Sequence, residues 1–164
     1  MAIAVVSELL TPMEIIAEMV VAHNWNFDCS DENQITIFVE GRYSEYEVAF
    51  NWFEDKQLLH IACAFEVKMT KRHLAQLREL MRLINESEWV GHFEYMPKIG
   101  MVLYRHALVC PPGELLSPKQ IYAMLDAALK ACEENHPAFT FVLEDKLAAA
   151  EAFELNIKET QGNA

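Results

Sequence analysis

Two groups of side chains in this 164-residue sequence have types and spacings that could do chemistry. Glu45 and Glu47 are two residues apart, so on a strand they share one face and could act as general acid and base on a polar substrate. Cys110 follows Arg105 and His106, and basic neighbours can activate a thiol as a nucleophile. We interpret the two acids as part of a solvated sheet face and Cys110 as a buried cysteine at a strand end.

Neither a longer catalytic motif nor a set of metal ligands at suitable spacing is present in the sequence. It contains no GxGxxG, P-loop, HExxH or GxSxG motif, and 5 glycines are too few for a glycine-rich phosphate loop. His60 and Cys63 would lie on opposite faces of a strand, whereas His106 and Cys110 would share a face but lie too far apart to hold an ion alone. We therefore predict no catalytic residue, no metal and no cofactor, and expect that the protein is not an enzyme.

Aromatic residues at the ends of predicted elements are more informative. Trp25 and Phe27 follow the first predicted helix, Trp52 lies near the end of a predicted strand, and Trp89 follows the second predicted helix. Aromatic residues in such places often complete a core, but they also anchor protein interfaces. We take Trp25, Phe27, Trp52 and Trp89 as the candidate partner-binding residues.

Charge separates the sequence into acidic and basic parts. The formal net charge is −12, which repels phosphate backbones and anionic lipids, so we expect neither nucleic acid nor a membrane as a partner. Residues 1–66 hold twelve acids and two bases, whereas residues 67–110 hold four acids and seven bases. Lys71, Arg78 and Arg82 would form a strip along one helix that faces acidic surface on the same or a partner subunit. Solvated faces that merely differ in charge are the alternative explanation.

Cysteine usage and hydropathy indicate a cytoplasmic protein. The apolar start of the chain contains no Lys or Arg, which a secretory signal needs. No stretch approaches the roughly 18 apolar residues of a membrane span. The four cysteines are far apart and form no CxxC motif, so we expect reduced, mostly buried thiols, with two disulfides as the alternative.

Capping residues and periodicity predict the elements that position these side chains. Thr11-Pro12-Met13-Glu14 is typical of a helix start, and that helix should run to about residue 23. Apolar and polar residues alternate over 34–40, 43–53 and 58–67, which indicates three strands in an antiparallel meander. A helix over about 71–88 precedes a hairpin of 92–96 and 101–110, and Ser117-Pro118 starts a third helix that ends near 135, where Pro137 interrupts it. Helical turns should follow over 138–143 and 146–157.

The predicted order is α-β-β-β-α-β-β-α with a C-terminal helical tail. This order favours a two-layer α+β fold, in which helices pack on one face of an antiparallel sheet. The other face of the sheet mixes acids with small residues and should be partly wet. The chain has the length of one domain, which we place at residues 11–158, with flexible ends at 1–10 and 159–164.

Several segments resemble the YbjN family, which is also catalogued as bacterial sensory transduction regulators. The central motif is Leu83-Ile84-Asn85-Glu86 followed by Trp89-Val90-Gly91-His92-Phe93-Glu94. Further agreement is found at residues 25–28, 63–65, 104–108 and 136–142, so the resemblance covers roughly residues 12–157. The family is similar in fold to class I type III secretion chaperones, which are small, acidic, cytoplasmic homodimers that bind extended segments of other proteins. The resemblance implies the same order of elements and brings no catalytic residues.

Our leading hypothesis is therefore a non-catalytic protein-binding module, chaperone-like or regulatory, that acts as a homodimer. It would capture an extended segment of another protein by strand addition or by packing in a groove. The alternative is a regulator that senses a small molecule in a pocket between helix and sheet.

Overall fold

The computed structural model describes residues 10–162. The four helices are α1 (Pro12–His23), α2 (Leu74–Ser87), α3 (Pro118–Leu143) and α4 (Ala149–Gly162), with short 3-10 turns η1 (Glu54–Lys56) and η2 (Lys71–His73). The six strands are β1 (Asn26–Asp31), β2 (Gln34–Glu40), β3 (Glu45–Phe53), β4 (Leu58–Glu66), β5 (His92–Met96) and β6 (Met101–Val109). The predicted α+β class with an antiparallel sheet is confirmed.

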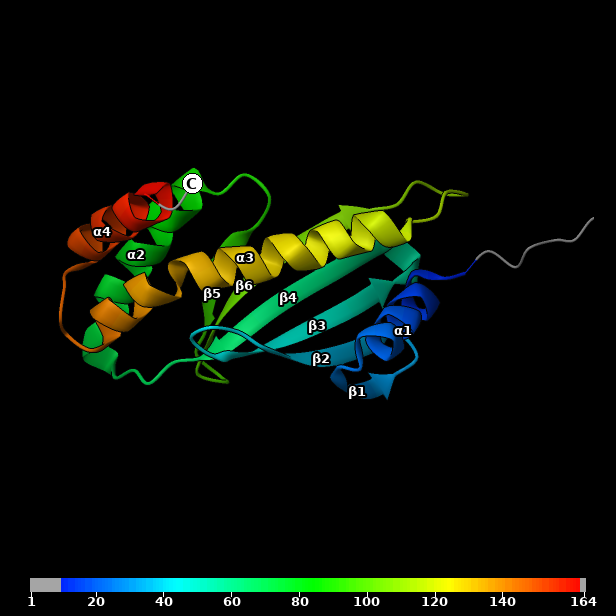
Figure 1. Ribbon diagram of the computed structural model, residues 1–164, viewed down its shortest axis with the longest axis horizontal. Helices are drawn as coiled ribbons and strands as arrows, with labels where there is room; N and C mark the ends of the chain where they lie inside the picture. Colours follow the sequence, from blue (N-terminus) through cyan, green and yellow to red (C-terminus); the bar gives the residue numbers. More distant parts are fainter. Residues whose placement is uncertain (1–9, 163–164) are drawn as a thin grey trace, which may run out of the picture.

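All six strands form one open sheet in the order β1-β2-β3-β4-β6-β5, and every neighbouring pair is antiparallel. The sheet contains a strand that the sequence did not predict, because β1 lies between α1 and the first predicted strand. All six residues of β1 are exposed, so it shows no alternation of buried and exposed side chains. The first and last strands of this order, β1 and β5, are the two edges of the sheet (Figure 1).

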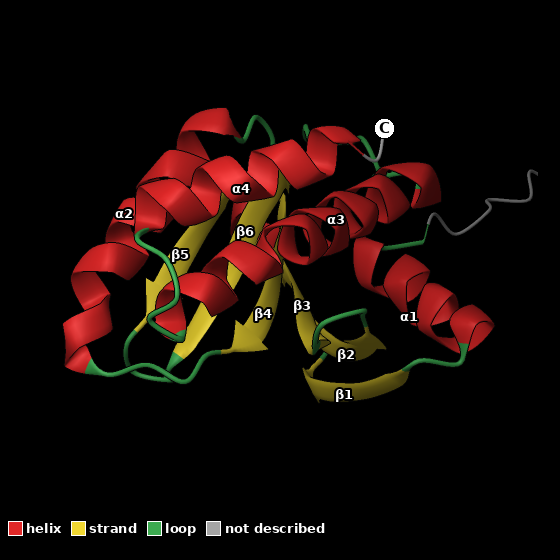
Figure 2. Cartoon of the chain, turned by 60° about the vertical axis from the view of Figure 1, so that its left-hand side comes forward, coloured by secondary structure: helices red, strands yellow, loops and turns green. Residues whose placement is uncertain are grey.

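The helices cover one face of the sheet, and the other face carries no helix in the described part of the chain (Figures 1 and 2). Helix α1 packs on β2, α3 crosses β4 and β6, and α2 packs on β5. Helix α4 packs mainly on α2 and α3, and it forms an outer addition to the helical layer (Figure 2).

Register explains why one face of the sheet is apolar. A single row across five strands contains only buried residues: Ile37, Val48, Cys63, Tyr104 and Phe93. Side chains alternate between faces along a strand, so the residues between these positions point to the uncovered face. There they are mostly small, polar or charged, as in the row Thr36, Ala49, Ala62, Arg105 and His92.

The predicted end of the third helix near residue 135 is wrong, because α3 continues through Pro137 to Leu143. A proline inside a helix has no N–H for the carbonyl four residues back, which usually ends or kinks a helix. Ala138, Phe139 and Val142 beyond it are all buried in the core. Burial of these side chains therefore compensates for the lost hydrogen bond, and no separate turn forms over 138–143.

Two other boundaries differ from the prediction. The region expected to begin the second helix forms the 3-10 turn η2, in which Thr70 and His73 cap each other, and α2 starts only at Leu74. Helix α4 spans Ala149–Gly162, so residues 159–162 continue this helix. The segment 1–9 lies outside the described residues.

Candidate functional site

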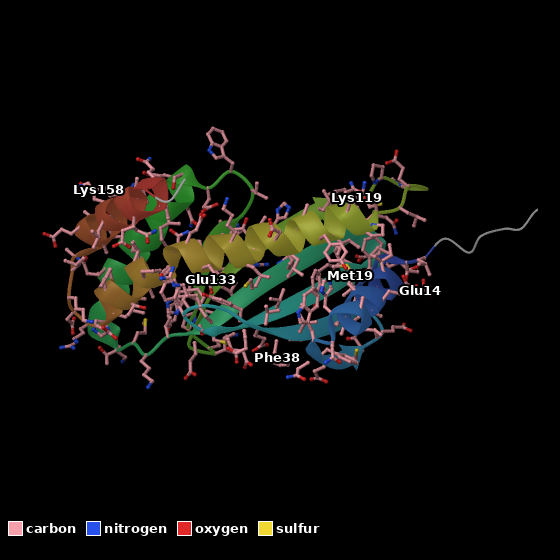
Figure 3. All side chains as sticks on the ribbon, viewed as in Figure 1. Glu14, Met19, Phe38, Lys119, Glu133 and Lys158 are labelled. Atoms are coloured by element: carbon pink, nitrogen blue, oxygen red, sulfur yellow. The ribbon has the colours of Figure 1, made fainter. Side chains whose placement is uncertain are left out.

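A groove of about 710 Å³ lies between α1 and the β1 edge of the sheet, and we call it the α1–β1 groove. Figure 3 labels Glu14 on α1 at this end of the molecule. The groove is lined from three directions: by the exposed side of α1, by the β1–β2 hairpin and by the end of β3. Its lining residues are Thr11, Met13, Glu14, Ala17, Cys29, Asp31, Glu32, Asn33, Ile35, Trp52 and Glu54.

The groove has apolar walls held by the ends of three elements. Met13 and Ile35 are buried, and Trp52 is half-buried against the core. The Trp52 main-chain N–H donates to the Asn33 carbonyl over 2.9 Å, which ties the end of β3 to the β1–β2 turn. A capping box at Thr11 and Glu14 fixes the start of α1 above them. These apolar side chains are therefore presented by rigid elements.

Acidic side chains surround the apolar part of the groove. Glu14, Asp31, Glu32 and Glu54 line it, and no Lys or Arg is among its described lining residues. Hydrogen bonds from the main-chain N–H and then the side chain of Thr11 hold the pKa of Glu14 below its ordinary value. Asp31 accepts a 2.7 Å hydrogen bond from the Asn33 N–H. The groove is thus apolar inside and negative at its rim.

The outer edge of β1 has main-chain groups without a strand partner. At the two ends of the β2–β3 pair, the Gly41 N–H donates to the Ser44 carbonyl and the Trp52 N–H donates to the Asn33 carbonyl. Hydrogen-bonded pairs alternate along an antiparallel ladder, so the odd-numbered residues of β2 bond to β3. The even-numbered residues of β2 therefore bond to β1 on its other side. The partners of the even-numbered residues on β1 are Asn26 and Asp28. The N–H and C=O of Phe27 therefore point away from the sheet, where no described strand pairs with them.

The opposite edge of the sheet is closed by a side chain. The Asn85 amide of α2 accepts the Phe93 N–H over 2.7 Å and donates to the Phe93 carbonyl over 3.0 Å. One side chain therefore satisfies both main-chain groups of Phe93, the second residue of β5. The two edges differ, because Asn85 blocks β5 at Phe93, whereas no described side chain bonds to the main chain of Phe27 on β1.

The four predicted partner-binding residues do not form one cluster. Trp25 is half-buried and stacks on His23, with ring centroids 4.4 Å apart. Phe27 is 55% exposed on β1, and Trp52 lines the α1–β1 groove, so these residues lie at the same end of the sheet. Trp89 follows α2, beyond the β5 edge, and is 97% exposed.

The predicted basic strip is divided between two elements. Lys71 lies in η2, whereas Arg78 and Arg82 lie on α2. Arg82 binds both oxygens of Glu79, at 2.8 and 2.9 Å, and also contacts Glu86. The neighbouring carboxylates on its own helix thus balance the Arg82 charge. Arg78 and Arg82 line a shallow groove beside Phe93 and Tyr95 of β5.

The residues considered for catalysis take the places expected for structural side chains. Glu45 and Glu47 are exposed on the uncovered face of the sheet. Cys110 is buried, and its Sγ donates to the Glu114 carbonyl over 3.0 Å. Cys63 and Cys132 are also buried, and only Cys29 is exposed. No group of three potential metal ligands occurs among residues 10–162.

Sequence reasoning missed both the groove and the closed edge. Trp52 was identified, but Met13 and Ile35 read as ordinary core residues. The position of Asn85 beside the apolar stripe of its helix indicated that its amide needs a hydrogen-bond partner. The strand that it bonds to could not be identified without the fold.

A family model described as "Putative bacterial sensory transduction regulator" matches residues 12–141, which is most of the chain. The chain belongs to the YbjN family. The crystal structure of YbjN from E. coli, described as "a putative transcription regulator", is similar with a TM-score of 0.54 at 8% identity, covering 83% of this chain and 92% of that one. The ExsC–ExsE complex is similar with a TM-score of 0.52 at 14% identity, covering 75% and 89%.

At these identities the two structures share the fold with this YbjN family member. No curated protein matches the chain. Within residues 10–162, no helix combines the length and apolarity needed to cross a bilayer.

Proposed function

We propose that the protein binds an extended segment of another protein in the α1–β1 groove, as a non-catalytic chaperone-like or regulatory module. The observation that carries this proposal is the unpaired edge of β1 beside a groove with apolar walls. An extended segment can pair its main chain with Phe27 and direct alternate side chains toward the groove between β1 and α1. The carboxylates at the rim favour a segment that carries Lys or Arg.

Relatives support a role in protein binding. The similar ExsC–ExsE structure is a complex of two proteins, and the YbjN family is described in regulatory terms. The proposal includes a homodimer in the cytoplasm, in keeping with the acidic composition and the secretion-chaperone-like fold.

Proline at Phe27 tests the strand addition. Because the Phe27 N–H points away from β2, Phe27→Pro removes a donor for an incoming strand but no hydrogen bond of the sheet. Phe27→Ala is the matched control, since it also removes the ring but keeps the N–H. We expect Phe27→Pro to lower recovery of the co-purifying partner, measured by quantitative mass spectrometry, at least about tenfold below Phe27→Ala. Equal recovery with the two variants would contradict strand addition at β1.

Light scattering after size-exclusion chromatography tests the homodimer. We expect a mass of about twice the 18.8 kDa of one chain at low and at high salt. A mass of 18.8 kDa at micromolar concentration would contradict it.

A small-molecule regulator is the second candidate, because the α1–β1 groove lies between a helix and the sheet and has the volume of a ligand pocket. A metabolite that binds the folded protein raises its melting temperature. Ala17→Arg fills the groove from an exposed position on α1. A rise in melting temperature that a metabolite causes in the unmodified chain but not in Ala17→Arg would favour this candidate over a protein segment.

A further inference from the structure

A second site is formed by basic side chains on the uncovered face of the sheet, near the β5 edge. His60 of β4, Arg105 of β6 and His92 of β5 lie close together there, and His92 is the direct cross-strand partner of Arg105. They line a pocket of about 290 Å³. Its other lining residues are Val90, Gly91, His106 and Ala107.

Hydrogen bonds orient the donors of this basic pocket. The Arg105 Nε–H donates to Nε2 of His60 over 3.1 Å, so the neutral His60 ring carries its proton on Nδ1. One terminal nitrogen of Arg105 donates to Glu94 over 2.7 Å, which leaves the other terminal nitrogen without a recorded hydrogen bond in residues 10–162. The exposed His92 ring also has none in that range. Three strands therefore supply N–H donors with capacity to spare.

The chain packs closely behind the basic pocket. A Cβ atom at Gly91 would lie 2.4 Å from the Tyr104 hydroxyl and 2.6 Å from the Arg105 carbonyl oxygen. Glycine is thus required where the chain enters β5, and the wall of the pocket is main chain of fixed shape. The pocket is small enough for a group of a few atoms.

Charge indicates what this pocket would bind. His92 lies directly opposite Arg105 across the two strands, and His60 accepts a hydrogen bond from Arg105, so these three side chains share one small area of the sheet. The charged and titratable groups that bear on the pocket from the uncovered face are His60 of β4, His92 and Glu94 of β5, and Arg105 of β6. Glu94 is the single acid among them and balances one charge. His106 also lines the pocket, but its side chain alternates to the helix-covered face.

The geometry points to a binding site for one small anionic group, a carboxylate or a phosphate, held by His60, His92 and Arg105. Arg105 supplies a permanent charge and a planar donor group, which suits both kinds of oxyanion. The histidines supply further N–H donors. Burial, followed by the nearby Arg105, lowers the pKa of His60. The His60 ring is therefore neutral at pH 7, and Arg105 supplies the charge that holds the anion.

Histidine NMR on the full chain tests this site. We would titrate sodium phosphate and, separately, sodium acetate against sodium chloride of equal ionic strength, at pH 6.0 and pH 8.0. We expect saturable shifts of the His60 and His92 ring signals with phosphate, with acetate or with both, at each pH. The two arms distinguish a phosphate ligand from a carboxylate.

Matched charge variants separate a site from general screening. Arg105→Gln should abolish saturation, whereas Lys98→Gln removes one charge from the β5–β6 turn of the same sheet and should leave it unchanged. Arg105→Gln also removes the ion pair with Glu94 and could disturb the fold, so Arg105→Lys is a second variant that keeps the charge. Arg105→Lys should retain saturable but weaker binding. Shifts equal to those in chloride, or saturation that persists in Arg105→Gln, would overturn the proposal. This test is independent of the α1–β1 groove.

Discussion

Asn85 closes the β5 edge with one side chain, and its removal should expose that edge and destabilise the fold. Asn85→Ala leaves the N–H and C=O of Phe93 without their partner, and Phe93 is only 3% exposed. Each unsatisfied buried group costs about 1–3 kcal/mol. The shallow groove beside Asn85 and Phe93 admits water, so each group costs about 1–1.5 kcal/mol, near the lower end of this range, and the two together cost about 2–3 kcal/mol.

Alanine also changes the helix itself. It is a better helix former than asparagine by about half a kcal/mol, which offsets part of the loss. We therefore expect Asn85→Ala to lower the free energy of unfolding by about 2 kcal/mol, measured by urea denaturation with an unchanged m-value. Asn85→Asp keeps the acceptor for the Phe93 N–H and should lose about half as much.

A surface control makes this prediction refutable. Arg78→Ala lies on the exposed part of α2 beside the same groove, and it should change stability by less than about 0.5 kcal/mol. If Asn85→Ala changed the free energy of unfolding as little as Arg78→Ala does, the hydrogen bonds from Asn85 to Phe93 would not stabilise the β5 edge. Asn85→Ala should also form larger species at high concentration in size-exclusion chromatography, because a second chain can pair with the freed edge.

Three further predictions concern the fold. Gly41→Ala should cost about 1–3 kcal/mol in denaturation, because its Cβ would lie 2.3 Å from the ring of the fully buried Tyr46. Ser117→Ala should cost about 1 kcal/mol, because the Ser117 side chain caps α3 by accepting the Gln120 N–H. Stability should fall in acid below the ordinary histidine pKa of 6.5, because burial lowers the pKa of His136 and the unfolded chain then takes up a proton that the folded protein does not. Urea denaturation at pH 7.5, 6.0 and 5.0 should show this decline, and His136→Asn should make it shallower.

Local signals were sufficient where a residue pattern determines a structure by itself. The capping box of Thr11 and Glu14 placed the start of α1, because the cap and its partner are three residues apart. Ser117 as cap with Pro118 at the first helical position placed the start of α3. Alternation over β3 and β4 predicted both strands, since burial on one face of a sheet has period two.

Features that depend on tertiary contacts could not be found in the same way. Strand β1 forms because its main chain pairs with β2, and its exposed side chains leave no pattern. Pro137 remains inside α3 because residues on both sides of it are buried. The α1–β1 groove combines α1, the β1–β2 hairpin and the end of β3, and the missed strand concealed it.

The acids of β1 bear on both parts of the proposed function. Exposed edge strands tend to pair with copies of themselves, and charged side chains oppose such pairing. Asp28 and Asp31 lie on β1, and the neighbouring Glu32 lines the groove. Two copies meeting edge to edge at β1 would bring these acids together, so a homodimer should form through another surface. A segment with basic side chains meets no such repulsion. The open edge of β1 is therefore better suited to a different protein than to a second copy of this chain.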